Sequence, residues 1–290
     1  MKSFLPSELE TKNLYGMLSG SVGPRPIAFV STLDKQGNPN LSPYSFFNVF
    51  SAKPPILIFS PVRRVRDNSI KHTLENALET KEVVINVVNW DIVQQMSLSS
   101  TEYPQGVNEF EKSGLTMLAS DLVKPPRVKE SPVQYECKVT DTIALGDHGG
   151  AGNLVIAEVV KLHIREDLLD EGLHIDQHKI DLVSRMGGNW YSRANQGMFE
   201  VEKPLQKQGM GVDHLPDSIR LSSVLTGNDL GKLGNVEVLP DKIKVNTFIE
   251  EHDLGHFIEE SSEERIHHIA QEYIEKNELD KALNILLAKQ

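Results

Sequence analysis

Short apolar runs recur through the first two thirds of the chain, and Pro, Gly, Asn and Asp residues separate them. Runs of this length that are bounded by turn residues are typical of β-strands. The pattern predicts about six strands, at residues 26–33, 54–61, 82–89, 132–145, 153–166 and, in the shortest run, 242–246.

Two of the predicted strands, 132–145 and 153–166, are about 14 residues long. Strands of that length suit neighbours that coil around a small barrel better than the strands of a flat sheet. The sequence Asp-Lys-Gln-Gly-Asn at 34–38 predicts a hairpin turn after the first strand. We therefore expect a mainly β protein whose strands form a closed or nearly closed antiparallel barrel.

Two segments beside the predicted strands have the spacing of amphipathic helices. Residues 69–81 place Leu74, Ala77 and Leu78 on one face. Residues 90–100 follow a predicted strand and have a similar pattern. We expect both segments to form helices that flank the barrel.

The last 30 residues have a different periodicity, with apolar positions at helical spacing on either side of a break at Asn277. These positions are Ile266, Ile269, Ala270, Tyr273 and Ile274 before the break, and Ala282, Ile285 and Leu286 after it. The pattern predicts a helical hairpin. One hairpin cannot bury its own apolar face, so we expect it to dock on the barrel or on a partner subunit.

These patterns divide the chain into three regions. We expect a barrel domain over residues 1–200, an irregular extension packed on the barrel over residues 201–260, and the helical hairpin over residues 261–290. The extension is predicted to be irregular because residues 196–235 are rich in Gly, Asp and Asn and contain few apolar runs.

The charge balance of the chain is acidic, with 30 Lys and Arg residues against 41 Asp and Glu residues and a formal net charge of −11. This balance argues against nucleic acid or an anionic membrane as the main partner, and against a barrel that binds single-stranded nucleic acid. Apolar runs such as 83–88 are far shorter than the roughly 20 residues of a membrane span.

Cysteine content and the start of the sequence bear on the compartment. The first residues lack the apolar run of a signal peptide, and Cys137 is the only cysteine. We therefore expect a cytoplasmic protein without an intrachain disulfide. Because Cys137 lies in a strand-like alternation and shares a face with Val139, we expect a buried and unreactive thiol.

Residues 23–61 combine strand-forming apolar residues with Ser, Asn and Arg at the turns. Such a mixture suits a flavin, which needs an apolar slot for its rings and hydrogen-bond partners for its polar edge. The apolar candidates are Pro26, Ile27, Phe46 and Phe47, and the polar candidates are Asn40, Ser42, Ser45 and Asn48.

A basic segment follows and leads into the predicted helix over residues 69–81. It carries Arg63, Arg64, Arg66, Lys71, His72 and Thr73. Cations and the free amides of a helix N-terminus stabilise a phosphate dianion, so this segment is a candidate phosphate site. From composition alone, a solvated basic loop is the alternative.

Four motifs in this order resemble the flavin reductase-like family of FMN-binding split barrels: GPRPIAFVST from residue 23, NLSPYSFFN from residue 40, the strand that begins with two prolines and ends at Ser60, and KHTLEN at 71–76. The family includes flavoredoxin and the reductase components of two-component monooxygenases, and the resemblance covers roughly residues 10–200. It implies a Greek-key antiparallel barrel that binds or exchanges FMN, with NAD(P)H as reductant. It also implies a homodimer with FMN near the subunit interface, and a monooxygenase or another redox protein as partner.

The resemblance assigns roles to particular residues. A Lys-Asp-Thr-x-x-Asn motif helps to hold the FMN phosphate in this family, and Lys71, Thr73 and Asn76 match it here, while His72 replaces the Asp and its role stays open. The resemblance favours the phosphate interpretation of the basic loop, with Arg66 among the ligands. It further implies a set of contacts with the rest of the cofactor, made by Arg25, Ser45, Phe46, Asn48 and Ser60.

The segment 184–194 is similar to the Arg-x-Gly-Gly-x-x-Tyr stretch that closes the barrel domain of the family. The matching residues are Arg185, Gly187, Gly188 and Tyr191. The two glycines allow close approach of the backbone. Either Trp190 or Tyr191 can cover the flavin or the nicotinamide site, and packing against the barrel is the alternative.

Other suggestive residues favour simpler interpretations. The histidine pairs 174/178, 252/256 and 267/268 lack a His-Glu-x-x-His core and a nearby cysteine, so they predict no metal site. The glycine-rich segment 146–153 joins two long strands and is more typical of a hairpin loop than of a dinucleotide fold. His148 at its tip is either a substrate contact or a solvated loop residue.

Two functions follow from these observations. The first is an NAD(P)H:flavin reductase, in which hydride passes from a nicotinamide to FMN. The flavin performs the chemistry, so no catalytic side chain is predicted. The alternative is a non-catalytic FMN electron carrier like flavoredoxin, which the missing nicotinamide fingerprint and the extra C-terminal hairpin favour.

Overall fold

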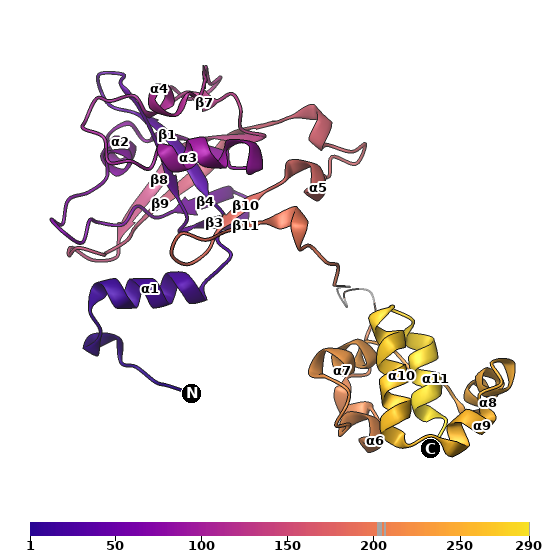
Figure 1. The fold of residues 1–290 in the computed structure, drawn as a ribbon. Helices are drawn as coiled ribbons and strands as arrows, with labels where there is room; N and C mark the ends of the chain where they lie inside the picture. Colours follow the sequence, from indigo (N-terminus) through magenta and orange to yellow (C-terminus); the bar gives the residue numbers. More distant parts are fainter. Residues whose placement is uncertain (202–204, 206, 290) are drawn as a thin grey trace. The chain divides into compact units, whose positions relative to one another are not determined.

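The computed structural model describes residues 1–201, 205 and 207–289. These residues form two compact units, Met1–Met198 and Phe199–Gln290 (Figure 1). Within the described residues, strands occur only in the first unit, and the second unit is helical. The chain therefore combines helix and strand, and the prediction of a mainly β protein suits only the first unit.

A seven-stranded antiparallel sheet forms the centre of the first unit. Its order is β2 (Pro39–Tyr44), β1 (Ala28–Leu33), β5 (Glu82–Val87), β8 (Val133–Ala144), β9 (Asn153–Ile164), β4 (Pro55–Phe59) and β3 (Phe47–Ala52). The five strands predicted in this unit are confirmed as β1, β4, β5, β8 and β9, and the predicted hairpin turn joins β1 to β2.

The sequence pattern does not predict the two edge strands. β2 carries Pro39 and Pro43, which lack the N–H group that a central strand needs, so its composition indicates a turn rather than a strand. β3 exposes Val49 and Phe50 and lacks a regular alternation of apolar and polar residues. Both strands are stable because each pairs with one neighbour that the pattern does predict.

The sheet coils so far that its two edges approach each other. Only Ser45 and Phe46 join β2 to β3, although these strands lie at opposite ends of the strand order. The ring centroids of Tyr44, at the end of β2, and Phe59, in β4 beside the opposite edge, are 5.5 Å apart, and one apolar cluster buries both rings. These contacts agree with the predicted nearly closed barrel, whose interior is filled mainly by apolar side chains of the strands and of α2 (His72–Thr80).

Both helices predicted beside the strands are present, as α2 and as α3 (Val93–Leu98). α2 buries Leu74 and Ala77 together with the polar side chains of Thr73 and Asn76. The prediction that Leu78 shares the buried face is wrong, since that side chain is 42% exposed. The buried stripe of α2 follows positions 73, 74, 76 and 77, so Leu78 falls beyond its edge.

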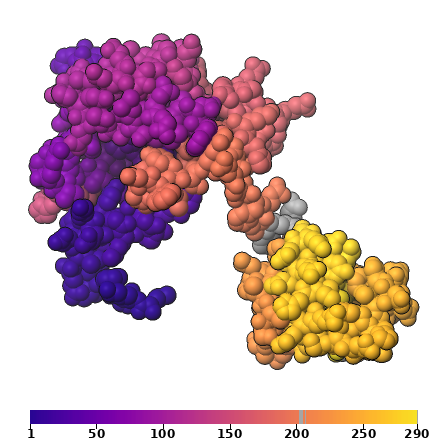
Figure 2. Space-filling view, in the orientation of Figure 1, coloured from indigo at the N-terminus to yellow at the C-terminus, as the bar shows by residue number. Residues whose placement is uncertain are grey.

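The helix α1 (Thr11–Ser21) stands out from the sheet, as the indigo segments of Figures 1 and 2 show. Only Ser19 of this helix is buried. The remaining elements of the first unit are short: η1 (Pro6–Glu8), η2 (Trp90–Ile92), α4 (Glu109–Ser113), β6 (Met117–Leu118), β7 (Arg127–Val128), η3 (Glu166–Leu168), α5 (Gln177–Ile180), β10 (Val183–Arg185), β11 (Tyr191–Arg193) and η4 (Ala194–Gln196).

The second unit contains one short 3₁₀ turn and six helices in its described residues. They are η5 (Val212–His214), α6 (Asp217–Arg220), α7 (Gly227–Gly234), α8 (Lys242–Glu251), α9 (Gly255–Glu260), α10 (Glu263–Glu275) and α11 (Leu279–Leu287). The predicted helical hairpin is confirmed as α10 and α11, and Asn277 at the break has a positive φ of 59°. Its apolar face packs against residues of α6 to α9 within the same unit, so the expectation that this face docks on the barrel or on a partner subunit is wrong.

Two further predictions for the second unit are wrong. Residues 242–246 are the start of helix α8 and not a strand, because Val245 and Phe248 are buried at helical spacing and the Asp241 carboxylate accepts from the N–H group of Lys244 at 2.8 Å. The expected irregular extension over 201–260 contains helices from residue 217 onward. Its Thr and Asp residues act as helix caps, as in the capping box between Thr226 and Asp229.

Among the residues that the structure describes, no helix has both the length and the apolar character that a membrane span requires.

Candidate functional site

Strand β2 presents three polar side chains to one pocket of the first unit. Asn40, Ser42 and Tyr44 occupy alternate positions, so their side chains point to the same side of the strand. Leu41, between them, points into the apolar core on the opposite side. The pocket is completed by Arg64, Lys71, His72, Thr73, Ser99, Ser100, Thr101, Glu102, Tyr103 and Glu109.

Two cations meet in this polar pocket at the beginning of helix α2. The guanidinium group of Arg64 donates to the Ser69 hydroxyl at 2.9 Å and to the Ile70 carbonyl oxygen at 2.7 Å, which fixes it beside Lys71. Burial lowers the pKa of Lys71, and the positive charge of Arg64 lowers it further. An anion bound here would relieve this repulsion and stabilise the charged form of Lys71.

The first turn of α2 adds hydrogen-bond donors to the same pocket. The helix begins at His72, and no side chain caps its N-terminus. Its first backbone N–H groups are therefore free to bind an acceptor that enters the pocket. The buried Thr73 hydroxyl lies 3.2 Å from the Asn40 side-chain oxygen, which orients both groups at the pocket wall.

The Tyr44 hydroxyl supports the presence of a ligand in this pocket. Tyr44 is 8% exposed, and among the described residues its buried hydroxyl has no well-formed hydrogen bond, although the hydroxyls of Thr73 and Ser42 lie close enough to favour its ionised form slightly. Burial raises the pKa of Tyr44, so the group stays a neutral donor. A buried hydroxyl without a partner costs free energy, and an oxygen-rich ligand in the pocket would satisfy it.

Two carboxylates also line the polar pocket. The Glu109 carboxylate accepts from the N–H group of Leu41 at 3.1 Å, and burial raises the pKa of Glu109. The Glu102 carboxylate faces the cations, and its hydrogen bond from Arg64 lowers the pKa of Glu102. The pocket therefore combines cations, neutral donors and two carboxylates, of which Glu102 faces the cations.

A second group of predicted residues lies where β2 ends. Arg25 donates to the carbonyl oxygens of Val22 at 2.7 Å and Met186 at 3.0 Å, and its guanidinium carbon lies 6.0 Å from the centroid of the Phe46 ring. Its Nε atom is 3.5 Å from the Ser45 hydroxyl. The Phe46 ring also contacts Tyr15 of α1, with centroids 5.9 Å apart. These side chains present an aromatic face and polar groups within a few residues of the polar pocket along the chain.

The structure distributes the predicted cofactor residues over several places. Asn40, Ser42, Lys71 and Thr73 line the polar pocket, and Arg25, Ser45 and Phe46 form the aromatic group next to it along the chain. The others lie outside the pocket: Pro26 and Asn48 are exposed, Ile27 belongs to the apolar core, Asn76 donates to Thr32, and Ser60 accepts from the N–H group of Asn153. These assignments stay predictions.

The three arginines of the basic loop differ in their exposure and in whether they reach the polar pocket, which the sequence does not reveal. The Arg64 side chain is 16% exposed and lines the pocket, whereas that of Arg66 is 67% exposed and reaches the pocket only through Glu102. The Arg63 guanidinium is turned away and binds Asn68. Sequence reasoning also missed Tyr44, which the alternation of Asn40 and Ser42 would have indicated if residues 39–44 had been predicted as a strand.

Segment 184–194 forms the hairpin of β10 and β11, which the N–H group of Arg185 ties to the carbonyl oxygen of Arg25 at 2.8 Å. The Arg185 guanidinium carbon lies 4.6 Å from the centroid of the Tyr191 ring. Trp190 is 78% exposed and so does not pack into the barrel core. The hairpin therefore holds exposed aromatic rings close to the backbone of Arg25.

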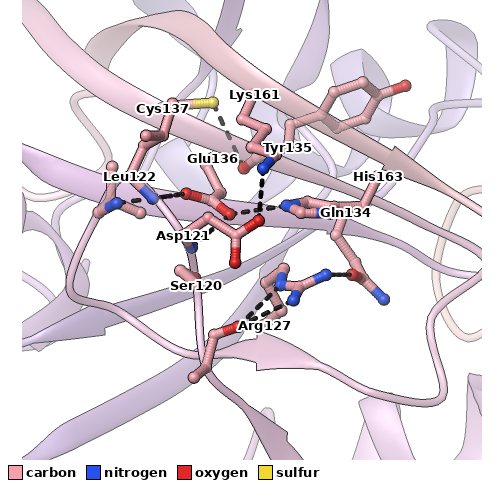
Figure 3. A network of polar contacts seen from close by, with 12 residues as sticks. Ser120, Asp121, Leu122, Arg127, Gln134, Tyr135, Glu136, Cys137, Lys161 and His163 are labelled. Atoms are coloured by element: carbon pink, nitrogen blue, oxygen red, sulfur yellow. Dashed lines mark hydrogen bonds and ion pairs between the residues drawn. The ribbon is translucent and has the colours of Figure 1, made fainter.

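A separate polar network lies on the outer side of strand β8 (Figure 3). Glu136 and Cys137 are neighbours that face opposite sides of the strand: Cys137 is the buried thiol that the alternation predicts and lies in the apolar core, whereas residues 121–123 cover Glu136. The Glu136 carboxylate accepts from the backbone N–H groups of Asp121 at 2.8 Å, Leu122 at 2.6 Å and Val123 at 3.2 Å, and lies 2.7 Å from His163 Nε2.

Three side chains of this network are of the types that bind metal ions, and their positions are explained by hydrogen bonds and ion pairs within the protein. Asp121, Glu136 and His163 each place one ligand atom within 4.8 Å of the others. Glu136 is saturated with donors, and Asp121 forms an ion pair with Lys161. The cluster therefore fastens residues 121–123 to the sheet.

Comparison with known proteins adds to this geometry. A profile of the flavin reductase like domain matches residues 21–182, which lie within the first unit. A protein of Aquifex aeolicus is 39% identical over 191 residues, which are 66% of this chain and 95% of the relative.

Two solved structures share the arrangement of the first unit. Nitrilotriacetate monooxygenase component B from Bacillus cereus has a TM-score of 0.66 and 32% identity, covering 69% of this chain and 98% of its own. The 2-nitrobenzoate 2-nitroreductase of Pseudomonas fluorescens has a TM-score of 0.64 and 29% identity, covering 72% of this chain and 100% of its own. Both names refer to redox enzymes.

Proposed function

Because the chain belongs to the flavin reductase like domain family, we propose that it is an FMN-binding split barrel that transfers hydride from NAD(P)H to FMN. The observation that carries the proposal is the polar pocket in which Arg64, Lys71 and the uncapped N-terminus of α2 converge. An anion of the size of a phosphate group suits that set of donors. The bound flavin supplies the hydride chemistry.

The residues of the chain hold and orient the cofactor. Lys71 and Arg64 neutralise the phosphate charge, Tyr44 donates a hydrogen bond to its oxygens, and the Thr73 hydroxyl does so by turning from Asn40 to the phosphate. The aromatic group of Arg25, Ser45 and Phe46 borders the isoalloxazine ring, because β2 leads from the phosphate site directly to it. A rigid strand between the two parts fixes the distance from phosphate to ring.

We further propose that the protein is a cytoplasmic homodimer and that a monooxygenase or another redox protein takes electrons from it. The name of the Bacillus cereus structure, a monooxygenase component, supports a partner of this kind. Val49 and Phe50 on edge strand β3 are 64% and 63% exposed, and apolar side chains at an edge suit a subunit interface. Light scattering coupled to gel filtration tests the dimer, and a mass of one chain would contradict it.

The proposed reaction makes a direct prediction for anaerobic titration. The protein loaded with FMN is expected to lose its flavin absorbance when NADH or NADPH is added under nitrogen, because hydride transfer reduces the ring. Steady-state oxidation of the nicotinamide with added FMN is expected to exceed the blank without protein. Bound flavin that bleaches only with a reduced redox protein would instead favour the flavoredoxin-like carrier. A protein that takes up no FMN would refute both functions.

A further inference from the structure

The most heavily engaged group in the polar pocket is a side chain of the protein itself. Glu102 follows helix α3 in the segment that supplies residues 99–103 to the pocket. One carboxylate oxygen, Oε1, lies 3.1 Å from Arg64 Nε and 3.7 Å from Lys71 Nζ. The other oxygen, Oε2, lies 2.7 Å from the Arg66 guanidinium. All three cations that the basic loop directs to this place are therefore paired with one carboxylate.

We propose that Glu102 is an internal competitor for the phosphate group of FMN, so that the incoming phosphate displaces the Glu102 carboxylate from Arg64 and Lys71. This inference rests on the proposed function, because it concerns the same pocket. Glu102 thereby sets how tightly the phosphate is held, and it favours a flavin that exchanges over one that stays permanently bound.

Displacement follows from the geometry of the donors. Arg64 donates from Nη1 to Ser69 and Ile70 and from Nε to Glu102, and the same Glu102 oxygen faces Lys71, so the carboxylate already occupies the position between the two cations. A phosphate group that uses the same donor meets the carboxylate at hydrogen-bond distance. Two like charges so close repel each other strongly in a partly buried site, so both anions cannot share the donor.

The structure also shows why Glu102 can leave. Its side chain is 40% exposed, whereas that of Arg64 is 16% exposed, so the carboxylate can turn into water while the cation stays fixed. The second carboxylate of the pocket, Glu109, is buried and bonded to the backbone of Leu41, so it cannot move in the same way. Glu102 is thus the movable anion of the pocket.

When no ligand is bound, Glu102 reduces the repulsion between Arg64 and Lys71. Arg64 and the half-buried Lys71 repel each other, and this repulsion helps to lower the pKa of Lys71, whereas Glu102 raises it. The carboxylate therefore keeps the cations together in the absence of a ligand. A phosphate dianion carries more charge and more acceptor oxygens than a carboxylate, so it wins the competition when it is present.

The test compares Glu102→Gln with the wild-type protein in fluorescence titrations with FMN and with riboflavin, which lacks the phosphate. Glutamine keeps the shape of the side chain but removes its charge. We expect FMN to bind about 3- to 10-fold more tightly to the variant, a size typical for one partly exposed charge pair. We expect the dissociation constant for riboflavin to stay unchanged. Glu171→Gln, which changes an exposed turn carboxylate, is the matched control and should leave both constants unchanged.

Every outcome of these titrations either supports or overturns the competition between Glu102 and the phosphate. Unchanged or weaker FMN binding by Glu102→Gln overturns the inference, and so does an equal gain for riboflavin, which would indicate an effect on the ring site. Glu102→Ala removes the whole carboxylate and should change FMN binding in the same direction if the glutamine variant does not fold. Failure of the wild-type protein to bind either flavin would refute the proposed function, which is distinct from wild-type binding that the Glu102 variants do not improve.

Discussion

Replacing Lys71 and Thr73 together by alanine is expected to weaken FMN binding by about 2–4 kcal/mol, or roughly 30- to 1000-fold in Kd. Lys71 is one of the two cations that line the pocket beside the start of α2, and Thr73 contributes a buried hydroxyl. Both side chains face the same small volume. Each charge-assisted or buried contact with a phosphate oxygen is therefore lost without a nearby replacement.

Riboflavin separates this effect from damage to the fold or to the ring site. The double variant should bind riboflavin as the wild-type protein does, because the ribityl and ring contacts do not involve the lost groups. Lys35→Ala is a suitable control, since Lys35 is an exposed cation that pairs with Glu79 outside the pocket. If FMN binds the double variant with unchanged affinity, the phosphate does not bind in this pocket.

The sequence predicts the framework of the first unit well, because its central strands are read from buried apolar runs. β1 and β5 are buried on both faces over nearly all of their length, so most of their residues are apolar, and β8 and β9 keep recognisable apolar positions among exposed polar ones. The edge strands escape prediction for the opposite reason. β2 meets one partner only, so it can tolerate prolines and place three polar side chains in a pocket.

The second unit shows where local composition misleads. Residues such as Thr226, Asp229 and Asp241 resemble those of a loop, but they satisfy free N–H groups at the starts of helices α7 and α8. Their effect depends on apolar residues further along the chain, including Leu233 and Phe248, which a common core buries. A prediction based only on the local polar composition therefore indicates irregular structure.

The sequence predicted part of the candidate site, and the residues that it missed were missed for a physical reason. Lys71 and Thr73 are adjacent to a helix start that the sequence reveals, so the phosphate pocket could be placed. Glu102 and Tyr103 belong to a polar segment without periodicity, and only the fold brings them to the basic loop. The difference between Arg64 and Arg66 likewise depends on the Ser69 hydroxyl and the Ile70 carbonyl oxygen, which accept from the Arg64 guanidinium and not from that of Arg66.

Glu136→Gln is expected to lower the free energy of unfolding of the first unit by about 2–4 kcal/mol. The amide group that replaces one carboxylate oxygen is a donor, so it faces the N–H groups of residues 121–123 without accepting from them. Both tryptophans of the chain, Trp90 and Trp190, lie in the first unit, so tryptophan fluorescence during urea unfolding reports that unit alone. The exposed control Glu171→Gln should change the free energy by less than about 0.5 kcal/mol.

The same carboxylate makes the stability of the first unit depend on pH. Burial alone would raise the pKa of Glu136, but the N–H groups of Asp121 and Leu122, together with His163, hold the pKa below its ordinary value. The unfolded state then binds more protons than the folded state between the two pKa values, so stability rises with pH in that range. The contribution is complete above the unfolded value of about 4.3 and is lost as pH falls through the lower folded value. Urea unfolding of the wild-type protein should therefore show a loss of stability below about pH 4.3 that is smaller in Glu136→Gln. Parallel pH profiles for the two proteins would show that Glu136 is not the carboxylate responsible.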